Sequence, residues 1–386
     1  MSPVKNGISS LRKAVVMPCI WMAVSALIMG VGYALCPETM QGGTILTRAN
    51  RIGVLLVRCG GAVYDNIGLV FACFAAYAFG EEKKDAMAYG LVSYLMVSAL
   101  LSPACLDAVI PSLCRQEIIT EAFGFLSGPV LGIPAGIAGA LALRVLARRG
   151  CDSVRMGIPA CAGLSLLLAV LLGVIWPVAY LLVKQMMIAS LGHGPLTAGV
   201  FVFLNRMFTP FGLNHAVNSV VLSDRAYIGD LVRYWAEETG PELGMYMGGF
   251  FAPMMFGIPG LLYAVYRDRM RRGLKDQRPY LLLFAIASFI VGASEPLEFL
   301  ILCQEPVFFM LLCLFYGMFA LISALLGFRA GFAFSGGLCD LIFSSAKAAS
   351  AKTWLILPVG AGAFLVFYLL TARILCNRKK ASDETK

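Results

Sequence analysis

Charged residues are scarce in this sequence: only 14% of its 386 residues are Asp, Glu, Lys or Arg, whereas 59% are hydrophobic. A soluble domain of this length needs a charged shell, and this composition cannot supply one. The chain instead holds many apolar stretches that approach or exceed the roughly 20 residues a helix needs to cross a bilayer. These stretches are residues 15–35, 67–79, 89–101, 125–143, 159–183, 245–266, 280–291, 307–326 and 354–370.

The apolar stretches predict an all-α polytopic membrane protein. Basic clusters lie beside the ends of these stretches, at Lys5 to Lys13, Lys83–Lys84, Arg144 to Arg155, Arg267 to Arg278 and in the tail. Cytoplasmic loops are enriched in this way, so the net charge of +9 indicates topology rather than a nucleic-acid partner. Both termini are therefore expected in the cytoplasm, with about eight to ten transmembrane helices plus re-entrant hairpins.

Metal-binding, disulfide and enzyme patterns are missing from the sequence. None of the 12 cysteines forms a Cys-x-x-Cys pair, and there are only two histidines, His193 and His215. Most cysteines lie inside apolar runs, where a thiol behaves as a small hydrophobic group. We therefore expect no metal and no cofactor, and no cleavable secretory signal is evident. Phosphate-loop, His-Glu-x-x-His and Gly-x-Ser-x-Gly motifs are also absent, so no catalytic residues are predicted.

The two halves of the chain differ in the length and continuity of their apolar segments. Residues 1–183 resemble conventional spanning helices with short basic loops, which favours a scaffold half; the family resemblance described below implies that this half also carries dimerisation. Residues 200–375 hold shorter apolar segments interrupted by Gly and Pro, as in "APMMFGIPG" and "RAGFAFSGGLCDLIF". Broken helices at membrane depth are tolerated where they line a water-filled cavity, so this half is predicted to bind and transport the substrate. Residues 184–199 would connect the halves, and residues 376–386 would form a charged cytoplasmic tail.

Polar side chains gather in this membrane-level sequence, where a charge costs several kcal/mol and therefore indicates function. Carboxylates, amides, an imidazole and an arginine together supply both acceptors and donors, which suits a neutral polyhydroxylated ligand. The predicted substrate-binding residues are Glu295, Arg206, His215, Asn214, Ser294 and Glu298. Gating or structural roles are predicted for Asp65, Asn66 and Asp340.

Structural roles compete with binding roles at several of these positions. Arg206 and a glutamate could form a buried pair that only fixes helix packing, and Glu298 could face a helix end or water. A single histidine such as His215 is more often a hydrogen-bonded core residue than a ligand. Asp340 could cap a hairpin, and Asp65 could hold the turn in "GGAVYDN". His193 in "LGHGP" is typical of a loop and is assigned no role.

Several motifs resemble, in collinear order, the glucose-family sugar permeases (enzyme IIC) of the bacterial phosphoenolpyruvate-dependent phosphotransferase system. "GASEPLEF" at residues 292–299 is similar to the family's "GITEPIEF", and "LNRMFTPFGLNHAVNSV" is similar to its "NRxLxPFGLHHxxN". Further matches are "LRKAVVMP", "GGAVYDNIGLVFA", "FFAPMMFGIPG" and "LGFRAGFAFSGGLCDLI". The resemblance extends from about Leu11 to at least Leu341.

This resemblance implies a homodimeric permease in the membrane lipid that takes up a sugar: glucose, N-acetylglucosamine, maltose or another glucoside. A phosphocysteine of enzyme IIB would phosphorylate the sugar on the cytoplasmic side, usually at the C6 hydroxyl. By position, Glu295 matches the glutamate of the first motif, while Arg206 and His215 match the arginine and the second histidine of the other. Asn214 replaces the first histidine, and the IIB cysteine pattern is absent, so either a separate polypeptide carries it or this copy has lost it.

Two other functions remain open from the residues alone. In an ion-coupled secondary sugar transporter, Glu295 would carry a proton instead of accepting hydroxyl protons. In a non-transporting sensor, the chain would bind sugar and recruit a cytoplasmic partner. Under the permease hypothesis, Pro296 ends a membrane helix early, so that the backbone and the Glu295 carboxylate face a sugar in a water-filled cavity.

Overall fold

The computed structural model describes residues 3–36, 47–111, 117–151, 153–192, 194–274 and 278–384. Every named element in these ranges is a helix, and Arg329 and Ala351 form an isolated antiparallel bridge. Seven helices are long and apolar enough to cross a membrane, or eight if the bent pair α5 and α6 forms one span. The all-α multi-pass architecture is thus confirmed, with seven or eight spans in the described ranges where the sequence predicts about eight to ten.

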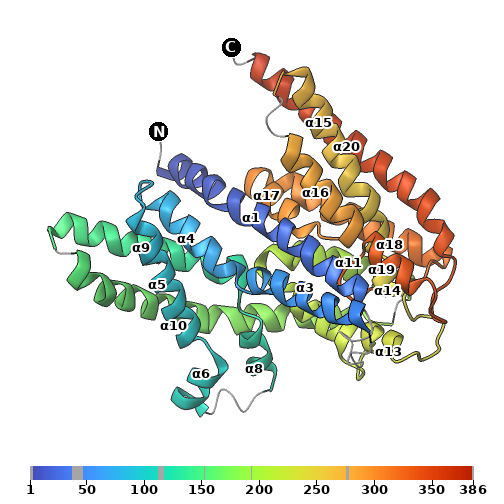
Figure 1. Cartoon of the computed structure of the whole chain (residues 1–386), viewed down its shortest axis with the longest axis horizontal. Helices are drawn as coiled ribbons and strands as arrows, with labels where there is room; N and C mark the ends of the chain where they lie inside the picture. The colour runs from blue at the N-terminus through green and yellow to red at the C-terminus, as the bar shows by residue number, and fades with distance from the viewer. Residues whose placement is uncertain are drawn as a thin grey trace.

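The front half of the chain forms a layer of packed helices. Helix α1 packs along α3 and α4, and α9 packs against α4, α5 and α10. In Figure 1, α10 runs along the lower side of this layer as one long helix. The helices are α1 (Pro3–Leu35), α3 (Arg48–Tyr64), α4 (Ile67–Phe79), α5 (Asp85–Leu100), α6 (Pro103–Val109), α8 (Glu117–Gly124), α9 (Gly128–Arg149) and α10 (Ser153–Ala189).

Helix α10 leaves a broad apolar surface uncovered. Only 22% of its most apolar window is buried inside the chain. Its exposed side chains recur every three or four residues, which is the spacing of one helix face. They include Leu167, Val170, Val174, Val178 and Leu182. Such a face suits contact with lipid or with a second copy of the chain.

The back half combines two long helices, α18 and α20, with many short elements at the Gly and Pro interruptions. Turns with wider, π-type hydrogen bonding interrupt two of its segments. Helix α11 packs on α18, and α15 packs on α20. The elements are α11 (Pro195–Phe208), η1 (Thr209–Phe211), α12 (Asn214–Asn218), η2 (Ser219–Ser223), α13 (Asp230–Trp235), α14 (Met245–Gly248), η3 (Pro253–Gly257), α15 (Ile258–Arg271), α16 (Arg278–Val291), α17 (Glu295–Gln304), α18 (Pro306–Leu326), α19 (Leu338–Ser344), η4 (Thr353–Leu355) and α20 (Ile356–Glu384).

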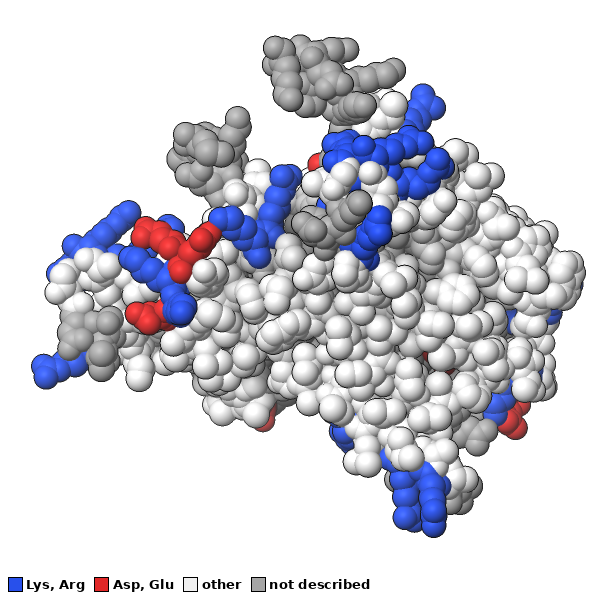
Figure 2. All heavy atoms as spheres, turned by 45° about the horizontal axis from the view of Figure 1, so that its top comes forward, with Lys and Arg blue, Asp and Glu red and all other residues white. Residues whose placement is uncertain are grey.

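On the face drawn in Figure 2, most of the charged side chains lie near the edges of the molecule. Figure 2 shows a broad band of uncharged atoms, with Lys and Arg gathered along the upper edge and in separate groups below. Both labelled chain ends lie at the top of Figure 1. An uncharged band between charged edges is the surface a membrane-spanning protein presents to lipid and to the two interfaces.

Three boundaries differ from those predicted. Helix α3 was not among the predicted apolar stretches because Arg48, Arg51 and Arg58 interrupt its apolar residues. The break between α10 and α11 is narrower than residues 184–199, since α10 continues to Ala189. Helix α20 continues through residue 384, so its backbone includes residues 376–384 of the predicted tail. His193 lies outside the described residues.

Candidate functional site

A buried arginine forms the centre of the predicted site. Arg206, near the end of α11, is 5% exposed. Its Nε and Nη2 donate to Asn205 Oδ1 at 3.0 and 2.7 Å, and Nη1 lies 3.5 Å from Ser294 Oγ. The ring of Phe250 lies under the guanidinium, 5.1 Å from Cζ to the ring centroid. A planar, multiply bonded guanidinium of this kind is held in one orientation.

Glu298 is the buried partner of this arginine. Its Oε2 lies 3.5 Å from Arg206 Nη1, and Tyr316 donates its hydroxyl to Oε1 at 2.7 Å. The side chain is 2% exposed. Arg206 and Glu298 thus form a buried pair of the kind that the sequence raises as a possibility. Pairing and hydrogen bonding offset the desolvation of both charges.

Glu295 is the accessible carboxylate of the group. Its Oε1 lies 3.8 Å from Arg206 Nη2, and Tyr64 of α3 donates its hydroxyl to Oε2 at 2.5 Å. The Glu295 side chain remains 30% exposed. A carboxylate offers about four lone-pair sites, so capacity remains for further donors. Glu295 therefore combines a fixed position with an open side.

The break that exposes Glu295 lies just before it. Helix α16 ends at Val291, and α17 begins at Glu295 with Pro296 in its first turn, where proline is tolerated. Gly292 has a φ of +73°, and a Cβ there would lie 2.7 Å from the backbone nitrogen of Gly336. The sequence assigned the interruption to Pro296, whereas the structure places it at 292–294, with Glu295 opening the next helix.

A second irregular segment crosses this break. Ser335 donates its hydroxyl to the carbonyl of Gly292 at 3.0 Å. Asp340 is buried and accepts backbone N–H bonds from Ala333, Phe334 and Ser335. These three bonds hold the segment 333–335 in place. Asp340 thus supports the loop beside the site.

His215 and Asn214 lie on the short helix α12, beside α11. The His215 ring stacks on Phe125, with centroids 4.4 Å apart, and Asn214 is buried. From the end of the same helix, Asn218 accepts a hydrogen bond from Asn205 at 2.6 Å, and Asn205 in turn accepts from Arg206. The helix is therefore tied to the arginine through two amides.

Asp65 and Asn66 form the turn between α3 and α4 and are exposed. The Asn66 amide donates to the carbonyl of Ala62 at 3.0 Å, which stabilises the end of α3. Neighbouring Tyr64, and not either of these residues, contacts Glu295. The motif "GGAVYDN" thus meets the site through its tyrosine.

Sequence reasoning missed several side chains that build the site. The sequence predicts no role for Tyr64, Tyr316 or Phe250, although the two tyrosines donate to the carboxylates and Phe250 lies under the guanidinium. A signal existed for Tyr64, which lies within a motif that the sequence singles out. Tyr316 lies in an otherwise apolar run, and only its position opposite α17 gives it a role.

Another buried carboxylate, Asp230, lies outside the long apolar helices. It accepts backbone N–H bonds from Gly244 at 2.7 Å and Met247 at 3.1 Å, tying α13 to α14. Burial raises the pKa of Asp230 to about 6, against the opposing effect of these bonds. This carboxylate therefore titrates in a mildly acidic range.

The site combines one partly open carboxylate, Glu295, with a buried arginine, a buried carboxylate and several amides, and its open acceptor suits hydrogen bonding to a polar neutral ligand. Within the described ranges, no group of three or more His, Cys, Asp or Glu side chains could hold a metal ion. Broken helices meet around charged side chains in a multi-pass membrane protein, which is the arrangement found in membrane transporters.

Comparison with known proteins identifies the family. A family model described as "Phosphotransferase system, EIIC" matches residues 156–317. An N-acetylglucosamine-specific EIICB component of Bacillus subtilis strain 168 is 30% identical over 323 residues, covering 81% of this chain and 68% of that protein. The chain belongs to the EIIC family of the phosphotransferase system, which confirms the resemblance seen in its motifs.

Two longer relatives are also similar. The N-acetylglucosamine-specific EIICBA component of Klebsiella pneumoniae is 29% identical over 86% of this chain and 51% of that protein. The corresponding component of Escherichia coli K12 is 27% identical over 97% of this chain and 56% of that protein. The chain thus spans about half the length of these two relatives.

Proposed function

We propose that this chain is a sugar permease of the phosphotransferase system, which binds a hexose or glucoside and moves it inward for phosphorylation by enzyme IIB. N-acetylglucosamine is the first candidate substrate, because three of the similar proteins carry that specificity in their names; another is named glucose-specific. The protein lies in the bacterial cytoplasmic membrane with both termini in the cytoplasm. In this proposal the phosphoryl group comes from a cysteine of enzyme IIB.

One observation carries the proposal: Glu295 is partly exposed while its neighbours hold it in place. The carboxylate accepts hydrogen bonds from sugar hydroxyls, and Arg206 keeps it oriented. Glu298 and Tyr316 act as positioning residues. Glu298 pairs with Arg206, and Tyr316 donates a hydrogen bond to Glu298. His215 and Asn214 contribute further polar contacts from α12. A neutral sugar gains affinity here because the site offers preplaced acceptors and donors.

The protein functions as a homodimer in this proposal. The uncovered apolar face of α10 supports this, because its exposed leucines and valines form a continuous stripe. A second copy covering that stripe would bury apolar side chains without leaving polar groups unpaired. Crosslinking of single cysteines placed along α10 tests the arrangement, and a purely monomeric protein in membranes contradicts it.

The test of the site is equilibrium sugar binding by the purified chain. Glu295→Gln should weaken N-acetylglucosamine binding at least tenfold, because a charged hydrogen bond contributes about 1.5–3 kcal/mol. Glu117→Gln serves as a matched control, since Glu117 is an exposed carboxylate on α8. Unchanged binding by a folded Glu295→Gln protein would remove this carboxylate from the site. A panel with glucose and maltose identifies the preferred sugar.

Transport assays separate this function from the alternatives. Uptake by cells should depend on phosphoenolpyruvate and on a cysteine-bearing IIB domain. Uptake abolished by a protonophore while phosphoenolpyruvate remains would favour an ion-coupled transporter. Sugar binding without any movement of sugar would favour a sensor.

A further inference from the structure

A basic pocket lies far from the sugar site, at the end of the front-half helices. It is a surface cavity of about 310 Å³ between the turn that follows α4 and the last turns of α9. Its lining residues are Gly80, Glu81, Lys83, Leu143, Arg144, Ala147 and Arg148. The proposed sugar-binding residues do not line it, so it belongs to no site described above.

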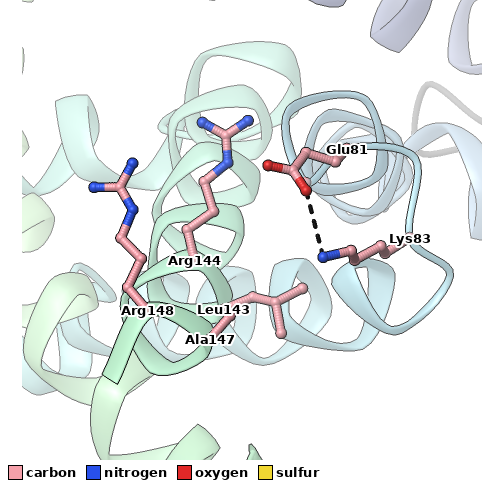
Figure 3. Close-up of a pocket in the computed structure, with 7 residues that line it drawn as sticks. Glu81, Lys83, Leu143, Arg144, Ala147 and Arg148 are labelled. Atoms are coloured by element: carbon pink, nitrogen blue, oxygen red, sulfur yellow. Dashed lines mark ion pairs between the residues drawn. The ribbon is translucent and has the colours of Figure 1, made fainter. Parts of the chain in front are cut away.

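Positive charge dominates the pocket. Figure 3 shows Arg144 and Arg148 rising side by side from α9, with Glu81 and Lys83 facing them from the turn. Glu81 lies 3.3 Å from Lys83, so these two charges offset each other. Neighbouring Glu82 pairs with Lys13 of α1. Arg144 and Arg148 therefore contribute a net charge of +2 that no carboxylate in the described ranges pairs with.

The helix end and the topology explain only part of this arrangement. Arg148 and Arg149 lie in the last turn of α9, where a cation also complements the helix dipole. Arg144 lies before the last turn, where that effect has faded. The positive-inside rule accounts for basic residues in the loop, but not for two guanidiniums turned to one cavity.

The surroundings of the pocket match a lipid. Leu143 and Ala147 line its apolar side, and Leu141 and Val145 on the same helix are 45% and 42% exposed. This uncharged surface ends at the basic pocket. A phospholipid bound here would have its acyl chains against the uncharged surface and its phosphate in the pocket. Basic pockets between membrane helices bind anionic headgroups by this chemistry. Guanidiniums also suit phosphate oxygens, which they contact through two N–H groups at once.

We propose that this pocket binds a phosphate group, supplied by the headgroup of an anionic phospholipid. Arg144 and Arg148 donate to the phosphate oxygens, and Lys83 adds a third positive charge. Glu81 opposes binding, and its pairing with Lys83 limits the repulsion. The apolar surface of α9 beside the pocket holds the start of an acyl chain. The proposal does not depend on sugar transport.

Lipid binding to the purified full chain in neutral detergent tests this site. We expect phosphatidylglycerol to bind at least tenfold more tightly than phosphatidylcholine of the same chain length, as read by native mass spectrometry. The double variant Arg144→Gln/Arg148→Gln should lose at least fivefold of that preference. Arg269→Gln/Arg271→Gln on α15 removes the same charge elsewhere and should retain it. An equal loss in both variants, or no preference in the unaltered protein, overturns the proposal.

Two further measurements sharpen the result. Glu81→Gln should tighten phosphatidylglycerol binding two- to fivefold, because it removes the opposing carboxylate, and weaker binding would contradict the proposed arrangement. Inorganic phosphate and glycerol phosphate distinguish the sources of the group. Displacement of the lipid at millimolar concentration supports a phosphate site open to soluble ligands. If neither inorganic phosphate nor glycerol phosphate displaces the lipid, and binding still depends on Arg144 and Arg148, the phosphate group comes from the lipid headgroup.

Discussion

The hydroxyl of Tyr64 lies 2.5 Å from Oε2 of Glu295, although 231 positions separate the two residues. Tyr64 ends α3 in the front half, and Glu295 begins α17 in the back half. Helix α1 likewise packs against α16 and α17. The front half, predicted to be the scaffold, therefore makes a direct hydrogen bond to Glu295, the carboxylate predicted to bind the sugar. Any movement of one half relative to the other has to break or carry this hydrogen bond.

Replacing Tyr64 with phenylalanine tests what the hydrogen bond between the two halves contributes. A hydrogen bond to a charged group contributes about 1.5–3 kcal/mol, so Tyr64→Phe should lower the thermal stability of the sugar-free protein. Saturating sugar should reduce that loss, because a sugar hydroxyl then replaces the missing donor. Thermal unfolding with and without N-acetylglucosamine measures both effects. Tyr227→Phe, at an exposed tyrosine, is the control; a loss independent of sugar would show that Tyr64 is only structural.

Arg206→Lys should impair sugar binding at least tenfold despite preserving the charge. A lysine ammonium cannot reproduce the two bonds to Asn205 together with the approach to Ser294 and Glu298. Binding titrations on protein that remains monodisperse measure the loss. Arg269→Lys on the exposed end of α15 should bind normally. Normal affinity in Arg206→Lys would show that charge alone suffices.

Gly292→Ala should destabilise the protein by about 2 kcal/mol or more, because the residue has positive φ and meets backbone atoms of the crossing segment. Sugar binding should weaken as well, since the same break aims Glu295. Gly163→Ala in α10 offers the matched control, where a Cβ meets nothing within 4 Å. That variant should be neutral or slightly stabilised. Equal stability of the two variants would contradict the strained crossing.

Asp230→Asn should flatten part of the pH dependence of stability. The pKa of Asp230 is about 6 in the folded chain against 3.8 for the ordinary group, so the folded state binds its proton more tightly. Its stabilising contribution is therefore complete below pH 4 and declines as pH rises through 6, by about 3 kcal/mol in total. The difference in unfolding midpoint between the two proteins should shift in this window. Asp107→Asn, an exposed aspartate, should show no such shift.

Much of the fold follows from composition. The apolar stretch at residues 67–79 coincides with α4, and residues 307–326 lie within α18, because a helix is the backbone's way of satisfying its hydrogen bonds in lipid. Helix α3 is not among the predicted apolar stretches, because its arginines lower its mean hydropathy. The break before Glu295 was expected within the right motif but assigned to Pro296, because the effect of Gly292 depends on a segment 44 residues later.

The sequence by itself determined that the chain spans a membrane, belongs beside the EIIC permeases and concentrates its polar residues in the back half, since hydropathy and motifs are local properties. Only the tertiary structure separated the two glutamates, burying Glu298 against Arg206 and Tyr316 while leaving Glu295 partly open. It also brought Tyr64 to the site and placed Glu81 and Lys83, from the turn after α4, in one pocket with Arg144 and Arg148 of α9. Burial and partnership depend on which distant helices pack together, and no short stretch of sequence contains that information.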